Sequence, residues 1–132
     1  MNLVRPSPLL RAALWLDAVG SGAVALLQLT AADPLAGWTG LARPLLMETG
    51  VLMLGWVALM VWLARHGRPP RALLQAVIGG NLAWALAAGA LAALLHPPLP
   101  GLALLALHMV AVTAFALLQA MGLARSAPAP AG

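Results

Sequence analysis

Apolar side chains form four long runs along the chain, and the polar residues gather between them. The runs cover residues of about 12–32, 42–64, 72–95 and 101–124. A helix needs about 20 apolar residues to cross about 30 Å of hydrocarbon, so each run has the length of a transmembrane helix. The pattern therefore predicts an all-α fold, a four-helix transmembrane bundle.

The segments between the runs are rich in residues that form turns. They are residues 33–40 after the first run, 67–70 after the second and 96–101 after the third, and each contains both proline and glycine. These residue types interrupt helices, so we expect loops at all three places. None is long enough to fold separately, and residues 1–125 are therefore expected to form a single four-span membrane domain.

The composition supports a membrane setting. Hydrophobic residues make up 63% of the chain and charged residues only 8%, whereas soluble domains carry about 25% charged residues. This excludes an ordinary soluble domain. The first run carries Asp17 and continues directly into a second apolar run, so we interpret it as a membrane span of the mature protein and not as a cleaved signal peptide.

The arginines predict the orientation, because cytoplasmic loops carry an excess of Lys and Arg. One arginine, Arg43, follows the first run, and the other six flank the opposite ends of the runs: Arg5, Arg11, Arg65, Arg68, Arg71 and Arg125. Both termini are then expected to be cytoplasmic. We expect Arg65, Arg68 and Arg71 to contact lipid headgroups. The tail, residues 126–132, is rich in Ala and Pro and is expected to be disordered and cytoplasmic.

The net charge of +4 does not indicate a nucleic-acid partner. It reflects a shortage of acids, which are only Asp17, Asp33 and Glu48, and the arginines lie at the ends of apolar runs and not in one basic patch. The chain has no cysteine, which excludes disulfides and thiolate metal sites. Arginine without lysine, beside abundant alanine, is typical of a bacterial protein, and the expected location is the bacterial inner membrane.

A weak internal repeat is visible along the chain. A shift of 60 positions aligns Arg11 with Arg71 and Gly20 with Gly80. If this is a duplication, each half is a helical hairpin and the two hairpins are parallel repeats. The alternative is that Ala- and Leu-rich spans of equal length produce the same matches by chance.

Polar side chains inside the runs are the candidate functional residues, since an ionisable group in hydrocarbon costs about 2.5–3.5 kcal/mol. Counting residues from the ends of the runs places them in two layers. The outer layer is Gln28, Glu48 and His108, and the inner layer is Asp17, Asn81 and Gln119. One interpretation is that these groups form hydrogen bonds that fix the register of the helices. The other is that Glu48 and His108 form a proton-titrating pair with Asp17 as an inner relay.

Two tryptophans, Trp56 and Trp84, fall in the middle of runs. A large ring there packs between helices or, alternatively, lines a ligand cavity with its indole N–H available. Of the three histidines, only His108 lies within a run, so a haem with two axial histidines is not expected within one chain, although a dimer pairing His108 with its symmetry mate would avoid this objection. Glu48 and His108 alone are too few ligands for a metal. No cofactor and no metal are expected.

The overall layout and the stretch Gly79, Gly80, Asn81 and Trp84 resemble uncharacterised small four-helix bacterial integral membrane proteins. This resemblance covers the whole chain and implies the fold but no activity. In length and in the acidic residue of its first span, Asp17, the chain is similar to small multidrug resistance transporters. It departs from that family because it has no tyrosine and no glutamate at this position.

These observations predict a non-catalytic integral membrane protein, because no loop carries a nucleophile with a base or a phosphate-binding glycine loop. We expect an accessory or assembly subunit of a membrane complex, or a self-associating bundle, with the lipid bilayer, other membrane subunits or itself as partners. The alternative is a small proton-coupled transporter or channel that acts as an oligomer. A third hypothesis is a haem- or quinone-binding electron-transfer subunit.

Overall fold

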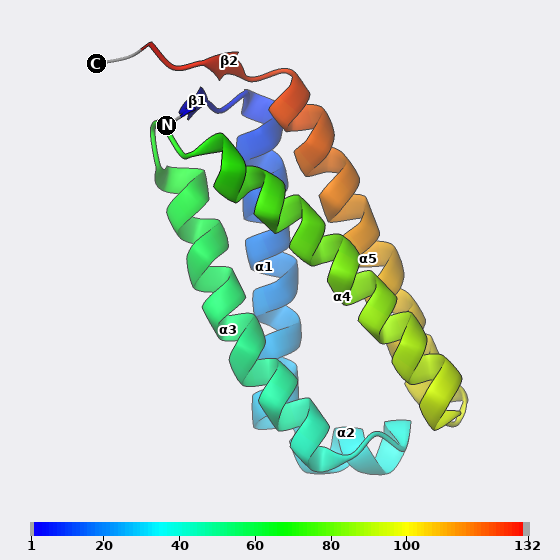
Figure 1. Cartoon of the computed structure of the whole chain (residues 1–132). Coiled ribbons are helices and arrows are strands. Elements are labelled where there is room, and N and C mark those ends of the chain that lie inside the picture. Colours follow the sequence, from blue (N-terminus) through cyan, green and yellow to red (C-terminus); the bar gives the residue numbers. More distant parts are fainter. Residues whose placement is uncertain (1, 131–132) are drawn as a thin grey trace.

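Each apolar run lies in one long helix of the computed structural model, which describes residues 2–130 (Figure 1). All four helices are long and apolar enough to cross a membrane. They are α1 (Pro8–Thr30), α3 (Arg43–Arg65), α4 (Arg71–Leu95) and α5 (Leu99–Ala124). The predicted all-α class with four membrane-spanning helices is therefore confirmed, and the chain is a multi-pass membrane protein.

Proline and serine set the helix starts. The hydroxyl of Ser7 accepts the backbone N–H of Leu10, and Pro8 occupies the first position of α1, where its missing N–H costs nothing. Pro44 and Pro100 lie in the first turns of α3 and α5 for the same reason. The helices thus begin and end close to the boundaries of the apolar runs.

A short fifth helix, α2 (Ala32–Thr39), occupies the segment that we expected to be a loop. Pro34 lies in its first turn, where proline is tolerated, and Asp33 beside it is favourable at a helix N-terminus. The hydroxyl of Thr39 donates to the carbonyl oxygen of Leu35, and Gly40 ends the helix with φ +70°. Aspartate and proline therefore start a helix here and do not mark a turn.

Two short strands close the other end of the bundle. β1 (Val4–Arg5) pairs antiparallel with β2 (Ala127–Pro128). The backbone N–H of Val4 also donates to the carbonyl oxygen of Pro69, which ties β1 to the connection between α3 and α4. The expected disorder of the tail thus does not describe Ala127–Pro128, and residues 131–132 lie outside the described part. The pairing joins segments more than 120 residues apart, which composition does not reveal.

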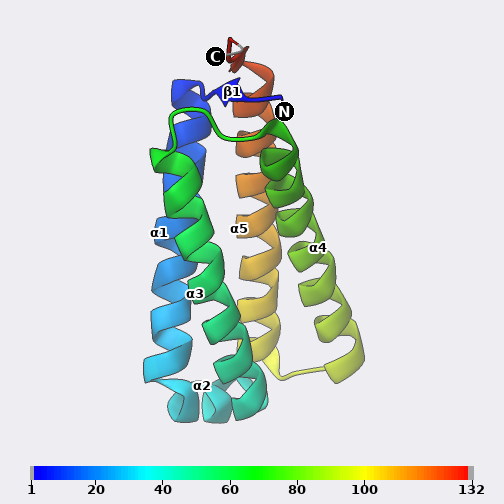
Figure 2. The ribbon, with the colours of Figure 1, turned by 60° about the vertical axis from the view of Figure 1, so that its left-hand side comes forward.

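The bundle has two distinct ends (Figure 1). β1, β2 and the α3–α4 connection lie at one, which we call the terminal end, and α2 and the α4–α5 connection lie at the other, the α2 end (Figure 2). Helix α1 packs against both α3 and α5, and α4 packs against α5. Helices α3 and α4 barely touch, and Figure 1 shows them diverging from the terminal end towards the α2 end.

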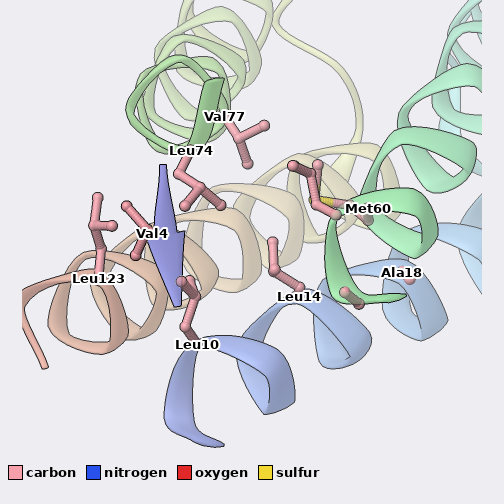
Figure 3. Packing of buried hydrophobic residues seen from close by; sticks show 10 residues of the cluster. Val4, Leu10, Leu14, Ala18, Met60, Leu74, Val77 and Leu123 are labelled. Atoms are coloured by element: carbon pink, nitrogen blue, oxygen red, sulfur yellow. The ribbon is translucent and has the colours of Figure 1, made fainter. Parts of the chain in front are cut away.

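Buried apolar residues form one cluster near each end. The cluster at the terminal end surrounds Val4, which is 1% exposed and lies near Leu74 and Leu123 (Figure 3). Its members come from β1 and from all four long helices. The second cluster joins α2, α3, α4 and α5 through Leu35, Leu46, Ala88 and Leu105. The polar residues of the inner layer lie between these two clusters.

Candidate functional site

The carboxylate of Asp17, on α1, lies at the centre of the bundle and is 0% exposed. Its Oδ1 accepts hydrogen bonds from Ser21 Oγ at 2.9 Å and from Trp56 Nε1 at 3.2 Å. Its Oδ2 accepts from Asn81 Nδ2 and from Gln119 Nε2, both at 2.8 Å. We call these five residues the Asp17 centre. All four long helices contribute to it.

The direction of each hydrogen bond is fixed by chemistry. An indole N–H can only donate, so Oδ1 of Asp17 is the acceptor for Trp56. Asn81 Nδ2 lies close to two acceptors, Asp17 Oδ2 and Gln119 Oε1 at 3.1 Å, which places its nitrogen and not its oxygen inside the centre. The four donors occupy the four acceptor positions of a carboxylate. Within residues 2–130, the one ion pair is between Arg43 and Asp33, so no cation compensates Asp17.

Local sequence explains how the donors reach Asp17. Ser21 follows Asp17 by one helical turn, which puts both side chains on the same face of α1. Trp56 reaches from α3 towards α4 because Gly80 has no side chain: a Cβ there would lie 2.7 Å from Cη2 of Trp56. Gly80 precedes Asn81, so the same stretch of α4 supplies both a space for the indole and a donor.

A cavity of about 390 Å³ lies beside the Asp17 centre, between α3 and α4. Polar residues on its wall are Ser21 and Asn81, and the indoles of Trp56 and Trp84 face it with several aliphatic side chains. A second cavity, of about 140 Å³, lies further towards the α2 end and is lined by Gln28, Thr49 and His108. Trp84 lines both.

The structure brings together the three residues of the predicted inner layer, Asp17, Asn81 and Gln119, through direct hydrogen bonds. Counting along each helix had placed them at one depth. The bond from the indole N–H of Trp56 to Asp17 was not predicted. Only the spacing of four residues could have assigned Ser21 to the same centre.

The predicted outer layer is different from what we expected. Gln28 is 5% exposed and accepts a hydrogen bond from Thr49 Oγ1 at 3.3 Å, and His108 lies with Nδ1 3.0 Å from the carbonyl oxygen of Leu104. Glu48 is exposed, lines neither cavity and forms no hydrogen bond within the described part of the chain. The Glu48–His108 pair is therefore not formed. One residue turns a helix by about 100°, so Thr49 faces Gln28 and Glu48 faces outwards.

Other candidates lie at the terminal end. Arg65 and Arg68 are exposed and Arg71 is half-buried, at the end of the bundle where a lipid headgroup would reach them. The ring of His66 stacks on Trp62 with centroids 4.5 Å apart. Within residues 2–130, no three His, Asp or Glu side chains converge as a metal site would need.

The Asp17 centre consists of a carboxylate, two amides, a hydroxyl and an indole, all engaged with one another, beside a cavity with mostly apolar walls. No protein-family model, no curated protein and no solved structure matches the chain.

Proposed function

We propose that this chain is a non-catalytic membrane protein that acts as an accessory or assembly subunit of a membrane complex, or as a self-associating bundle. The observation that carries the proposal is the Asp17 centre, in which donors from all four spanning helices converge on one carboxylate. Between membrane helices such bonds contribute about 0.6–2 kcal/mol each, and they fix the register that apolar contacts leave open. The polar groups thus specify one arrangement of helices.

The outer surface fits a protein surrounded by lipid and by other membrane helices. Large apolar side chains such as Val19, Leu86 and Leu107 are more than 60% exposed, which in water would be a liability. Six of the seven arginines belong to the terminal end, so the positive-inside rule supports cytoplasmic termini. The arginine usage supports the bacterial inner membrane as the location.

The composition of the native particle tests this proposal. The chain is extracted in its own lipid from the membrane in which it is naturally made, without overexpression, and the particle is weighed by native mass spectrometry. We expect either a fixed stoichiometry with other polypeptides or a defined homo-oligomer. A monomer without partners would overturn the proposal, and so would a stoichiometric haem or quinone, which would indicate electron transfer.

A second candidate function is a small proton-coupled carrier acting as an oligomer. It is favoured by the arrangement of the cavities: the smaller one lies between the Asp17 centre and the α2 end, whereas Leu14, Met60 and Leu63 are buried on the terminal side. A proton path would run through these cavities from the α2 end to the Asp17 centre. The polar groups along it are Gln28, Thr49 and His108, and Glu48 lies outside it.

Proton flux into liposomes loaded with a pH-sensitive dye separates the two functions. A carrier predicts flux that His108→Gln abolishes and that Glu48→Gln, its matched control on the outer face of α3, leaves intact. Flux equal to that of liposomes without protein would remove the carrier hypothesis. Loss of flux with Glu48→Gln alone would contradict the path described above.

A further inference from the structure

The amide oxygen of Asn81 has no partner within the described part of the chain, although the residue is only 2% exposed. Both protons of its Nδ2 are used, on Asp17 Oδ2 at 2.8 Å and on Gln119 Oε1 at 3.1 Å. These two bonds fix the orientation of the amide, so Oδ1 is directed away from the Asp17 centre. An unpaired carbonyl oxygen in a protein interior is destabilising.

This oxygen is not sealed inside the protein. Among the described residues, every side-chain nitrogen or oxygen that is fully enclosed has a hydrogen-bond partner. Oδ1 of Asn81 has none and therefore borders on free space. Asn81 lines the cavity of about 390 Å³, and that cavity is the space next to it. The cavity is thus bordered by a hydrogen-bond acceptor, Oδ1 of Asn81, that has no donor.

The remaining walls define what kind of donor fits. Ser21 gives its proton to Asp17 and can offer a cavity occupant only lone pairs. Trp56 and Trp84 also line the cavity, and aromatic rings in a binding site favour cations over anions. The carboxylate of Asp17, one hydrogen bond behind Asn81, adds a negative charge with no compensating cation in contact. The polar part of the cavity therefore favours donors and positive charge and disfavours anions.

The cavity is accessible from the side of the bundle. Leu52 lines it and is also 61% exposed on the outer surface of α3. Helices α3 and α4 barely touch, so no close contact between these two helices separates the cavity from the outer surface. A molecule dissolved in the bilayer could reach Asn81 without crossing water, and the apolar walls formed by Met53, Leu59 and Val112 would contact its apolar body.

We propose that the cavity between α3 and α4 binds a compact apolar molecule with a hydrogen-bond-donating head, an ammonium or a hydroxyl group, which donates to Oδ1 of Asn81. This goes beyond the accessory function, which needs no ligand. The site is formed by one chain and does not depend on a partner subunit.

A series of adamantane derivatives tests the proposal, because they share one apolar body and differ only in the head. The full chain in lipid nanodiscs is titrated with radiolabelled adamantan-1-amine, with empty nanodiscs as background. Adamantan-1-ol, trimethyl(adamantan-1-yl)ammonium and adamantane-1-carboxylate are the competitors. We expect the amine to bind at least about tenfold more tightly than the trimethylated cation and the carboxylate, since a hydrogen bond to a charged donor is worth about 1.5–3 kcal/mol. The alcohol should compete as well.

A pair of glycine variants locates the binding. Gly55 lines the cavity and a Cβ there meets nothing within 4 Å, so Gly55→Leu adds a bulky side chain to the cavity wall without a backbone clash. Gly79→Leu is the control, because Gly79 is also open but does not line the cavity. We expect Gly55→Leu to weaken binding of the amine at least about tenfold and Gly79→Leu to leave it unchanged.

Several results would overturn the proposal. They are binding of the amine no greater than in empty nanodiscs, equal competition by the carboxylate or by the trimethylated cation, and unchanged binding in a folded Gly55→Leu variant. If Gly55→Leu does not fold, the competition series on the unaltered chain still decides between a donor-specific site and none.

Discussion

Helices α1 and α5 meet through small residues, whereas α3 and α4 are separated by a large side chain. In the first pair, Gly122 lies so close to α1 that a Cβ would be 2.5 Å from the backbone nitrogen of Leu10. The hydroxyls of Ser7 and Ser126 both donate to the carbonyl oxygen of Gly122, at 2.7 and 2.8 Å. Small residues bring two backbones together, and short side chains bond them at the terminal end.

In the second pair, a large side chain keeps the helices apart. Trp56 reaches across from α3, its ring lies against Gly80 of α4, and its indole N–H is held by Asp17 of α1. The ring can neither withdraw from α4 without losing its hydrogen bond nor move closer. Trp56 therefore connects α3 with both α1 and α4 beside the cavity that it lines.

Removing the acceptor of the whole centre should have the largest effect. Asp17→Ala removes the acceptor that four donors share, and we expect the free energy of unfolding to fall by about 3–5 kcal/mol. Thermal unfolding in detergent, followed by circular dichroism, measures the change. Asp33→Ala removes an exposed carboxylate and its ion pair with Arg43 and should change stability by less than about 1 kcal/mol. Equal losses in both variants would contradict a structural role for the Asp17 centre.

The second largest loss of stability is expected when the close contact between α1 and α5 is broken. Gly122→Ala places a methyl group against the backbone of Leu10, which cannot move aside, and should cost about 2–3 kcal/mol. The same unfolding measurement applies. Gly67→Ala, in the α3–α4 connection where a Cβ meets nothing within 4 Å, is a control at the same end of the bundle. A Gly122→Ala variant as stable as the control would show that the two backbones are not in contact.

A smaller effect is expected at the contact between Trp56 and Gly80. Gly80→Ala puts a methyl group 2.7 Å from the ring of Trp56, which must shift, and we expect a loss of about 1–2 kcal/mol with a change in tryptophan emission. Gly79→Ala, one position away and facing open space, should leave both stability and emission unchanged. If emission stays constant in a destabilised Gly80→Ala variant, Trp56 does not lie against α4.

The smallest effect belongs to the outer layer. Thr49→Val keeps the shape of the side chain but removes the hydroxyl, which lies 2.7 Å from the carbonyl oxygen of Leu45 and 3.3 Å from Gln28 Oε1, and this should cost about 0.5–1 kcal/mol. Glu48→Gln, on the neighbouring but outward-facing position, should change stability by less than about 0.5 kcal/mol. A larger loss of stability with Glu48→Gln than with Thr49→Val would indicate that Glu48, and not Thr49, faces the interior.

The sequence predicted the depth of the polar residues along the bundle well, but it did not predict which face of each helix points inwards. The four long helices follow from the apolar runs, and counting residues from their ends placed Asp17, Asn81 and Gln119 at one level. The same counting chose Glu48 where the structure has Thr49, because depth changes by only 1.5 Å per residue while the helix face turns by about 100°. Which face points inwards is decided by packing between helices, and uniformly apolar spans carry little information about it.

The helix α2 and the bond from Trp56 to Asp17 were missed for different reasons. Aspartate and proline are common in turns and also at helix starts, and only the fold decides which applies at Asp33 and Pro34. The bond from Trp56 joins residues 39 positions apart on different helices, and it exists because Gly80 on a third helix makes room. No local pattern records such a three-helix arrangement.

The strand pair at the terminal end has a consequence for biogenesis. The carbonyl oxygen of Leu3 accepts the backbone N–H of Ala129, and Asn2 accepts that of Arg71. During synthesis Ala129 emerges from the ribosome only after all four spans have been made. The N-terminal segment, including the buried Val4, must therefore wait outside its final place while the helices insert. Pairing of β1 with β2 is accordingly among the last steps of folding after the helices have been inserted.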